Sequence, residues 1–155
     1  MEDTNLLEAL DHIGSLLDSG SQVDTIYLDM SKAFEKVSHG RLVHQLIQVG
    51  FGDNLLNWFC SYLSGRFQRV TVLGATTDNL PVTSGVPQGS ILGPSLFLLY
   101  VNDLPEVVSS SSRVLMFADD TKIFREIKSL DDAFSLQEDL GKLATWSYSS
   151  GLLFN

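Results

Sequence analysis

Cysteine, basic residues and long apolar runs are all scarce in this sequence of 155 residues. The single Cys60 excludes an internal disulfide and fits a reducing, intracellular compartment, without distinguishing nucleus from cytoplasm. The longest apolar run, 91–101, is interrupted by Gly93-Pro94, and Met1-Glu2-Asp3 does not open a signal peptide. We therefore expect no membrane span and no membrane partner.

The charge balance is acidic, with 10 Lys and Arg against 19 Asp and Glu and a net charge of −9. A domain that binds nucleic acid without help from other domains usually carries a basic surface. We therefore expect this chain alone to bind nucleic acid weakly, so that any role on DNA or RNA needs positive charge from elsewhere. Apolar residues make up 44% of the chain, which permits a packed core and excludes a disordered tail.

Apolar periodicity predicts both helices and strands. Helices are expected over 4–17, 41–49, 54–63, 91–102 and 131–147, and strands over 25–30, 67–73, 80–83, 113–118 and 121–125. The elements are mixed rather than strictly alternating, which favours the α+β class, with an antiparallel sheet and helices packed on one face. The aromatic residues Trp58, Phe59 and Tyr62 are expected in the core rather than on a base-stacking surface.

Three carboxylates stand out by their position. Asp29 closes an apolar strand, and Asp119-Asp120 lie at the tip of an apolar hairpin. Carboxylates beside a sheet core are costly unless they are paired or bound to a cation, and Mg²⁺ prefers oxygen ligands and suits phosphate chemistry. The alternative is that Asp-Asp is simply turn chemistry, as helix capping explains the similar pair Asp131-Asp132.

The loop 84–90 is rich in turn residues and leads into an apolar helix. The N-terminus of a helix attracts anions such as phosphate, and the Gln88 amide can both donate and accept hydrogen bonds there. Taken alone, this segment is better explained as a plain turn before a helix.

Three segments together are far more specific than any one of them. These segments are 27–39 (YLDMSKAFEKVSH), 84–94 (SGVPQGSILGP) and 117–121 (FADDT). In this order and spacing they resemble three successive motifs of the reverse transcriptases of non-LTR retrotransposons, the LINE-type, jockey-like elements. The resemblance extends over nearly the whole chain, with Glu35 standing where an Asp is usual.

The resemblance implies a role for each matching residue. Asp29, Asp119 and Asp120 would be the catalytic carboxylates that hold two Mg²⁺ ions, and Met30 would lend a backbone carbonyl. Phe34 would lie under the incoming sugar and reject a 2′-hydroxyl, while Gln88 and Gly89 would contact the nucleotide and template. The implied partners are an RNA template, a DNA primer and deoxynucleotides.

The resemblance also implies the extent of the domain. Residues 1–155 would be a partial reverse transcriptase domain of the right-hand polymerase fold, truncated at both ends. It would comprise the palm with part of the fingers, and it would lack most of the fingers and the whole thumb. We therefore expect the isolated chain to be inactive. A non-catalytic remnant, acting as an interaction module or without function, is an open alternative. An unrelated Mg²⁺ phosphohydrolase is a third, but no base to activate water is evident.

Overall fold

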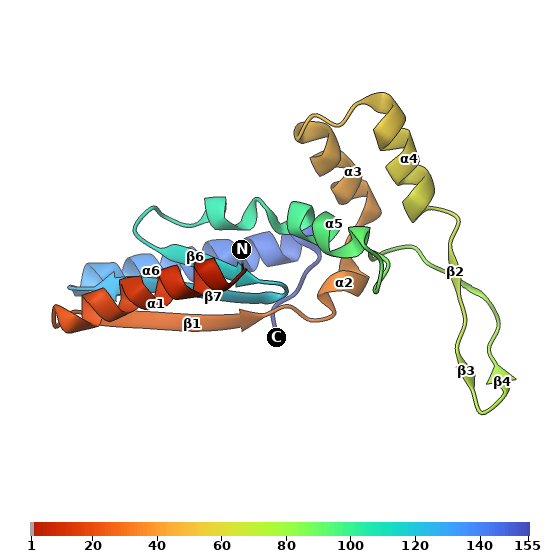
Figure 1. The fold of residues 1–155 in the computed structure, drawn as a ribbon. Coiled ribbons are helices and arrows are strands. Elements are labelled where there is room, and N and C mark those ends of the chain that lie inside the picture. The colour runs from red at the N-terminus through yellow and green to blue at the C-terminus, as the bar shows by residue number, and fades with distance from the viewer. Residues whose placement is uncertain (1) are drawn as a thin grey trace. The chain divides into compact units, whose positions relative to one another are not determined.

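The computed structural model describes the backbone of residues 2–155 and the side chains of residue 7 and residues 9–155 (Figure 1). The chain forms two compact units. One contains the residues up to Ser31 together with Val101–Asn155, and the other contains Lys32–Tyr100. Within the described residues, no helix is both long and apolar enough to cross a membrane.

A three-stranded antiparallel sheet forms the centre of the first unit. It consists of β1 (Gln22–Asp29), β6 (Arg113–Phe117) and β7 (Asp120–Ile127) in the order β1-β7-β6. The register runs from Gln22 opposite Ile127 at one end to Asp29 opposite Asp120 at the other. The central strand β7 is therefore paired on both sides, and its first residue lies beside the last residue of β1.

Helices cover both faces of this sheet. The ring of His12 in α1 (Glu2–Asp18) lies 6.0 Å from the ring of Phe124, while Asp139 of α6 (Leu130–Ser150) lies against Arg125. Consecutive strand residues point to opposite faces, so α1 and α6 lie on opposite sides of β7. The expected α+β class and antiparallel sheet are confirmed, but the helices are not confined to one face. The reason is that the neighbouring residues Ile123 and Phe124 are both buried and need cover on each side.

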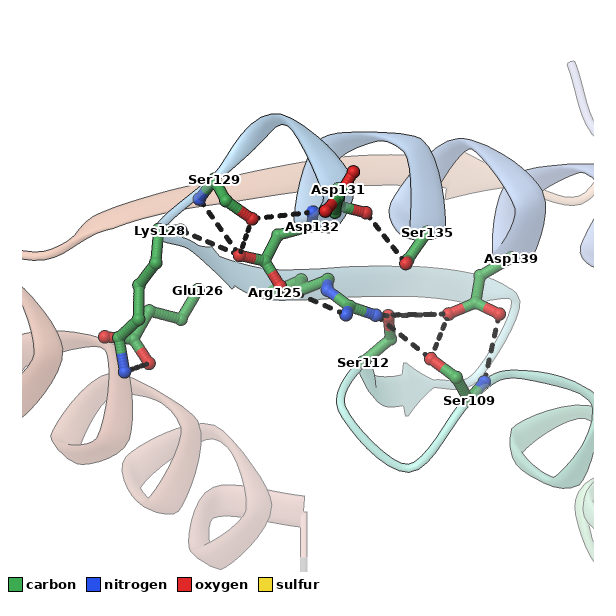
Figure 2. Close-up of polar contacts among 10 residues, drawn as sticks. All are labelled: Ser109, Ser112, Arg125, Glu126, Lys128, Ser129, Asp131, Asp132, Ser135 and Asp139. Carbon is green, nitrogen blue, oxygen red and sulfur yellow. Dashed lines mark hydrogen bonds and ion pairs between the residues drawn. The ribbon is translucent and has the colours of Figure 1, made fainter.

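A buried polar cluster fixes α6 to the sheet (Figure 2). The Asp139 carboxylate accepts hydrogen bonds from Ser109, Ser112 and Lys142 and lies 4.0 Å from Arg125 Nη1. Burial raises the pKa of Asp139, but the hydrogen bonds from Lys142, Ser109 and Ser112 outweigh it and lower the pKa to about 2. Asp139 is thus a buried ionised carboxylate that ties together α6, β7 and the loop after the 3₁₀ helix η1 (Leu104–Val107).

The N-terminus of α6 confirms that helix capping explains Asp131-Asp132. The Ser129 side chain accepts a hydrogen bond from the backbone of Asp132, and the Asp132 carboxylate accepts one from the backbone of Ser129, which is a capping box (Figure 2). The helix ends at Gly151, which has a φ of 77° and provides the left-handed C-cap.

The second unit is helical apart from one hairpin. Its elements are α2 (Ala33–Lys36), α3 (His39–Gln48), α4 (Asp53–Leu63), most of α5 (Leu92–Val101) and the strand pairs β2 (Phe67–Gln68) with β5 (Leu80–Pro81) and β3 (Thr71–Val72) with β4 (Ala75–Thr76). Leu42, Leu46, Phe97 and Tyr100 are buried in its core. Gln45 Nε2 donates to the Tyr100 carbonyl at 2.9 Å, which satisfies the nitrogen of this buried amide.

The hairpin 67–81 and the aromatic side chains of α4 differ in detail from expectation. The predicted strand pairing exists, but it forms short ladders around a Leu73-Gly74 turn with positive φ at both residues. The side chains of the hairpin are exposed, so its strands do not pack against an apolar layer that would stabilise longer strands. Phe59 is buried as expected, whereas Trp58 is 49% exposed and stacks on Tyr62, because it lies on the outer side of the helix.

Candidate active site

The three aspartates meet at one end of the first unit's sheet. Asp29 is the register partner of Asp120, so the two side chains emerge on the same face. The backbone amide of Met30 donates to the Asp119 carbonyl at 3.4 Å. The Cα atoms of Asp29 and Asp119 are therefore within roughly 9 Å, from typical spacings across a strand pair and along a chain.

The turn between β6 and β7 explains why Asp120 is available to the site. Phe117 pairs with Asp120, which leaves only Ala118 and Asp119 as turn residues, and Ala118 has a φ of 53°. Two-residue hairpin turns need such a positive φ. The prediction that both aspartates form the turn is therefore wrong by one position: Asp119 lies in the turn and is half-buried, while Asp120 begins β7 and is exposed.

The donor set fits a hard divalent cation. Carboxylates of Asp29, Asp119 and Asp120 offer only oxygen atoms, which is the ligand chemistry of Mg²⁺. Among the side chains that the structure describes, however, no three His, Cys, Asp or Glu are already arranged to hold a metal ion. Asp120 is exposed, so rotation of its side chain can redirect its carboxylate without disturbing the core.

Two residues beside the aspartates were not singled out from the sequence. Tyr27 is the register partner of Lys122, and Lys122 Nζ lies 5.0 Å from the centre of the Tyr27 ring. They lie two residues from Asp29 and Asp120 along their strands and so share the same face. The alternation of side chains along each strand is the signal that could have identified them. The ammonium group of Lys122 is a positive charge on the same face as Asp29 and Asp120, next to the acidic end of the sheet.

The second unit places Phe34 against the loop 84–90. The carbonyl of Phe34 accepts a hydrogen bond from Val86 N at 2.9 Å, and Ser84 Oγ donates to the Glu35 carbonyl at 2.9 Å. The Phe34 ring is half-buried and stacks on Phe97, with ring centroids 4.6 Å apart. Its ring therefore has one packed face and some exposed surface.

Glycine is required where this loop touches α2. Gly85 is buried with a φ of 86°, and a Cβ atom there would lie 2.9 Å from the carbonyl oxygens of both Phe34 and Glu35. Gly89 also has a positive φ, and Gln88 beside it is exposed. The predicted helix after the loop is confirmed as α5, and Ser90 Oγ accepts a hydrogen bond from Gly93 N near its start.

A groove of about 510 Å³ lies in the second unit between this loop, α2 and the hairpin. The groove is lined by the basic residues Lys32, Lys36 and Arg66, by the acidic residue Glu35, and by Gln68 and Gln88. The unit carries five basic and three acidic residues, whereas the first unit carries five basic and sixteen acidic residues. The overall acidity therefore belongs to the first unit, and the second has a local concentration of positive charge that composition alone hides.

An antiparallel sheet with aspartates at adjacent strand ends, flanked by helices, is typical of the palm of a nucleic-acid polymerase. Comparison with known families agrees: residues 5–155 match the family "Reverse transcriptase (RNA-dependent DNA polymerase)". The chain belongs to this family, which confirms the resemblance found in its motifs. Members of the family are generally metal-dependent.

Curated relatives come from retrotransposons. The chain is 32% identical over 136 residues to the "RNA-directed DNA polymerase from mobile element jockey" of Drosophila melanogaster, with 83% of this chain covered. It is 31% identical over 146 residues to the "Probable RNA-directed DNA polymerase from transposon X-element" of the same species, with 92% covered. The chain spans only 15% and 16% of the lengths of these two relatives.

A solved structure supports the fold. The chain is similar to telomerase from Candida tropicalis, in a complex with a fragment of telomeric RNA, with a TM-score of 0.66 and 13% identity. The match covers 96% of this chain and 28% of the telomerase chain. At this identity the likeness shows the fold alone.

Proposed function

We propose that this chain is the catalytic palm, with part of the fingers, of a retrotransposon RNA-directed DNA polymerase. The observation that supports this most directly is the register that pairs Asp29 with Asp120 beside the Ala118-Asp119 turn. It brings the aspartates of two separate family motifs to one edge of one sheet. In the proposed reaction, the 3′-oxygen of a DNA primer bonds to the α-phosphorus of a deoxynucleotide and pyrophosphate leaves.

The proposed cofactor is a pair of Mg²⁺ ions. Asp29, Asp119 and Asp120 would hold them, with help from the Met30 carbonyl. When bound, such ions stabilise the charge on the attacking and leaving oxygens of an in-line displacement. The protein itself supplies position: β1 and the β6–β7 hairpin hold the three carboxylates on one rigid sheet edge.

The proposed nucleotide contacts lie in the second unit. The exposed part of the Phe34 ring would pack under the sugar of a deoxynucleotide and leave no room for a 2′-hydroxyl. The exposed Gln88 amide would hydrogen-bond to the nucleotide or template, and Gly89, which has no side chain, would let the backbone approach closely. The Lys32, Lys36 and Arg66 groove offers positive charge to a phosphate backbone.

The proposed macromolecular partners are an RNA template and a DNA primer. The basic groove supports nucleic-acid contact in the second unit, and the acidic first unit limits how tightly this chain can bind by itself. A non-catalytic remnant that serves as an interaction module is the alternative, and the family assignment does not favour it.

A chimera tests the function. Residues 5–155 would replace the similar segment of the jockey polymerase, and primer extension on an RNA template would be measured with deoxynucleotides and Mg²⁺. We expect extension that Asp119→Asn abolishes, because the substitution removes a charge but keeps the side-chain size. Extension that is unaffected by Asp119→Asn would contradict the proposal.

The chain itself supplies a second test that does not depend on folding of the chimera. Mg²⁺ should raise the melting temperature of the 155-residue chain by binding its native state, and Asp119→Asn should remove most of this increase. A wild-type melting temperature that does not respond to Mg²⁺ would contradict a metal site in this chain.

A further inference from the structure

Asn155 contacts Asp29 through both its backbone and its side chain. Asn155 N donates to the Asp29 carbonyl at 2.9 Å, and Asn155 Nδ2 donates to Asp29 Oδ2 at 2.6 Å. The two residues lie far apart in the sequence, and the contact brings a neutral amide directly onto a carboxylate of the candidate active site.

The segment that carries Asn155 is itself firmly held. Ser31 N donates to the Leu153 carbonyl at 2.8 Å, and Met30 forms an antiparallel bridge with Phe154. Leu152 is fully buried, and its carbonyl accepts a hydrogen bond from Ser147 Oγ of α6 at 2.6 Å. The position of the Asn155 side chain is therefore set by α6 on one side and by the end of β1 on the other.

The side-chain contact is not needed to hold this segment in place. The backbone hydrogen bonds already attach it to Asp29 and Ser31, and they do not involve the Asn155 side chain. Asp29 is exposed, so water can satisfy its carboxylate if the amide is removed. A hydrogen bond between exposed groups contributes little to stability, because it replaces hydrogen bonds to water.

The contact does restrict the orientation of the Asp29 carboxylate. An exposed aspartate otherwise samples several rotamers, and a metal ligand is most effective when it is already oriented. The amide engages Oδ2 and leaves Oδ1 as well as the second lone pair of Oδ2 as acceptors. Because the amide is neutral, it orients the carboxylate without neutralising the charge that attracts a cation.

We propose that Asn155 is a positioning residue that holds the Asp29 carboxylate in the orientation required for divalent-cation binding. This inference rests on the proposed function, in which Asp29 is a metal ligand. Asn155 acts through Asp29 and needs no contact with the substrate. Hydrogen-bond partners of metal ligands typically change metal affinity by about 10- to 100-fold when they are removed.

The experiment measures metal affinity directly on the 155-residue chain. Free Mn²⁺, used as a paramagnetic substitute for Mg²⁺, is titrated by electron paramagnetic resonance, and Mg²⁺ is used to displace it. The variants are Asn155→Ala, Asn155→Leu, which keeps the shape but loses the donor, and Asp29→Ala. Asn79→Ala, an exposed asparagine in the hairpin, is the matched control.

We expect Asn155→Ala and Asn155→Leu to weaken Mn²⁺ binding at least about ten-fold. Their melting temperatures without metal should stay close to that of the wild type, and Asn79→Ala should change neither quantity. A purely structural residue would instead lower the metal-free melting temperature and leave the Mn²⁺ affinity intact, which would overturn the positioning role.

The outcomes separate this inference from the proposed function. Binding that Asp29→Ala abolishes, and that both Asn155 variants retain in full, overturns the role of Asn155 and supports the metal site. A wild-type chain that binds no Mn²⁺ overturns both.

Discussion

Asp29 and Asp120 lie directly opposite each other in the register of β1 and β7. Like charges in this relationship repel and weaken a strand pair. Turn chemistry does not account for Asp120, because Ala118 and Asp119 alone form the turn and Asp120 belongs to the strand. The proposed cation binding would account for the arrangement, since a bound cation would convert the repulsion into shared attraction.

This repulsion gives the first prediction. Asp120→Asn should raise the free energy of unfolding of the metal-free chain by up to about 1 kcal/mol, since it removes one of two facing charges. The same substitution should reduce the stabilisation by Mg²⁺. Urea unfolding with and without Mg²⁺ measures both effects. Asp78→Asn, in the exposed hairpin, is the control, and an Asp120→Asn chain that is less stable without metal would contradict the prediction.

The second prediction concerns Gly85. Gly85→Ala should lower the free energy of unfolding by about 2–4 kcal/mol, because the new methyl group meets two carbonyl oxygens at 2.9 Å and the φ of 86° is also strained. Gly74→Ala is a matched control: its φ is 85°, but nothing lies within 4 Å of its Cβ position. It should cost only about 1 kcal/mol. Equal losses in the two variants would show that the close approach to α2 contributes nothing.

The third prediction is a pH dependence from Asp139. Its pKa is about 2 in the folded chain and about 4 in the unfolded chain, so the folded state binds fewer protons. The resulting stability is complete above about pH 4 and is lost as the pH falls from about 4 to about 2. It amounts to about 2–3 kcal/mol. Urea unfolding measured between pH 2 and pH 6 should show this loss.

Asp139→Asn should flatten that part of the pH profile. It should also destabilise the chain at pH 7 by about 3 kcal/mol, because Arg125 then loses a buried partner. Glu138→Gln, at the exposed neighbouring position, is the control and should leave the profile unchanged. The pKa of Asp132 is also lowered, mainly by the hydrogen bond from the Ser129 side chain. Both variants should therefore keep a smaller dependence of the free energy of unfolding on pH. If the free energy of unfolding of Asp139→Asn fell as steeply between pH 4 and pH 2 as that of the wild type, the assignment of this pH dependence to Asp139 would be wrong.

The fourth prediction concerns Phe34 in the active chimera. Phe34→Ala should raise the incorporation of ribonucleotides relative to deoxynucleotides by at least about ten-fold, because removing the ring makes room for a 2′-hydroxyl. Phe34→Tyr keeps the ring and should keep the discrimination. The measurement is single-nucleotide primer extension with each nucleotide in turn. Unchanged discrimination in Phe34→Ala would mean that the ring serves only to pack against Phe97.

Much of the fold could be predicted from the sequence, because apolar periodicity is a local property. All five predicted helices exist with ends within a few residues of those expected. β1 begins at Gln22, three residues earlier than predicted, because residues 22–24 form backbone pairs with the far end of the longer strand β7 although they contain no apolar run. The short helices α2 and η1 lack a periodic signal and were not predicted.

The candidate site was only partly predictable, because register and long-range contacts are not local. Motif order indicated Asp29 and Asp119, but the one-residue placement of the turn depends on the positive φ of Ala118. Arg66 joins Lys32 and Lys36 only when the hairpin folds against the loop 84–90. No spacing rule marks Asn155 as the partner of Asp29.

The last prediction is that the isolated chain binds nucleic acid weakly and does not extend a primer. Acidic residues dominate the first unit, and only Lys32, Lys36 and Arg66 gather in one groove. Three cations should give a shallow salt slope, about −2 to −3 for log affinity against log salt. Lys36→Glu with Arg66→Glu should remove the residual binding to an RNA–DNA primer-template, whereas Lys128→Glu, on the acidic unit, should change it little. Tight binding with a steep salt slope, or extension that Asp119→Asn abolishes, would show that these 155 residues are sufficient for the reaction.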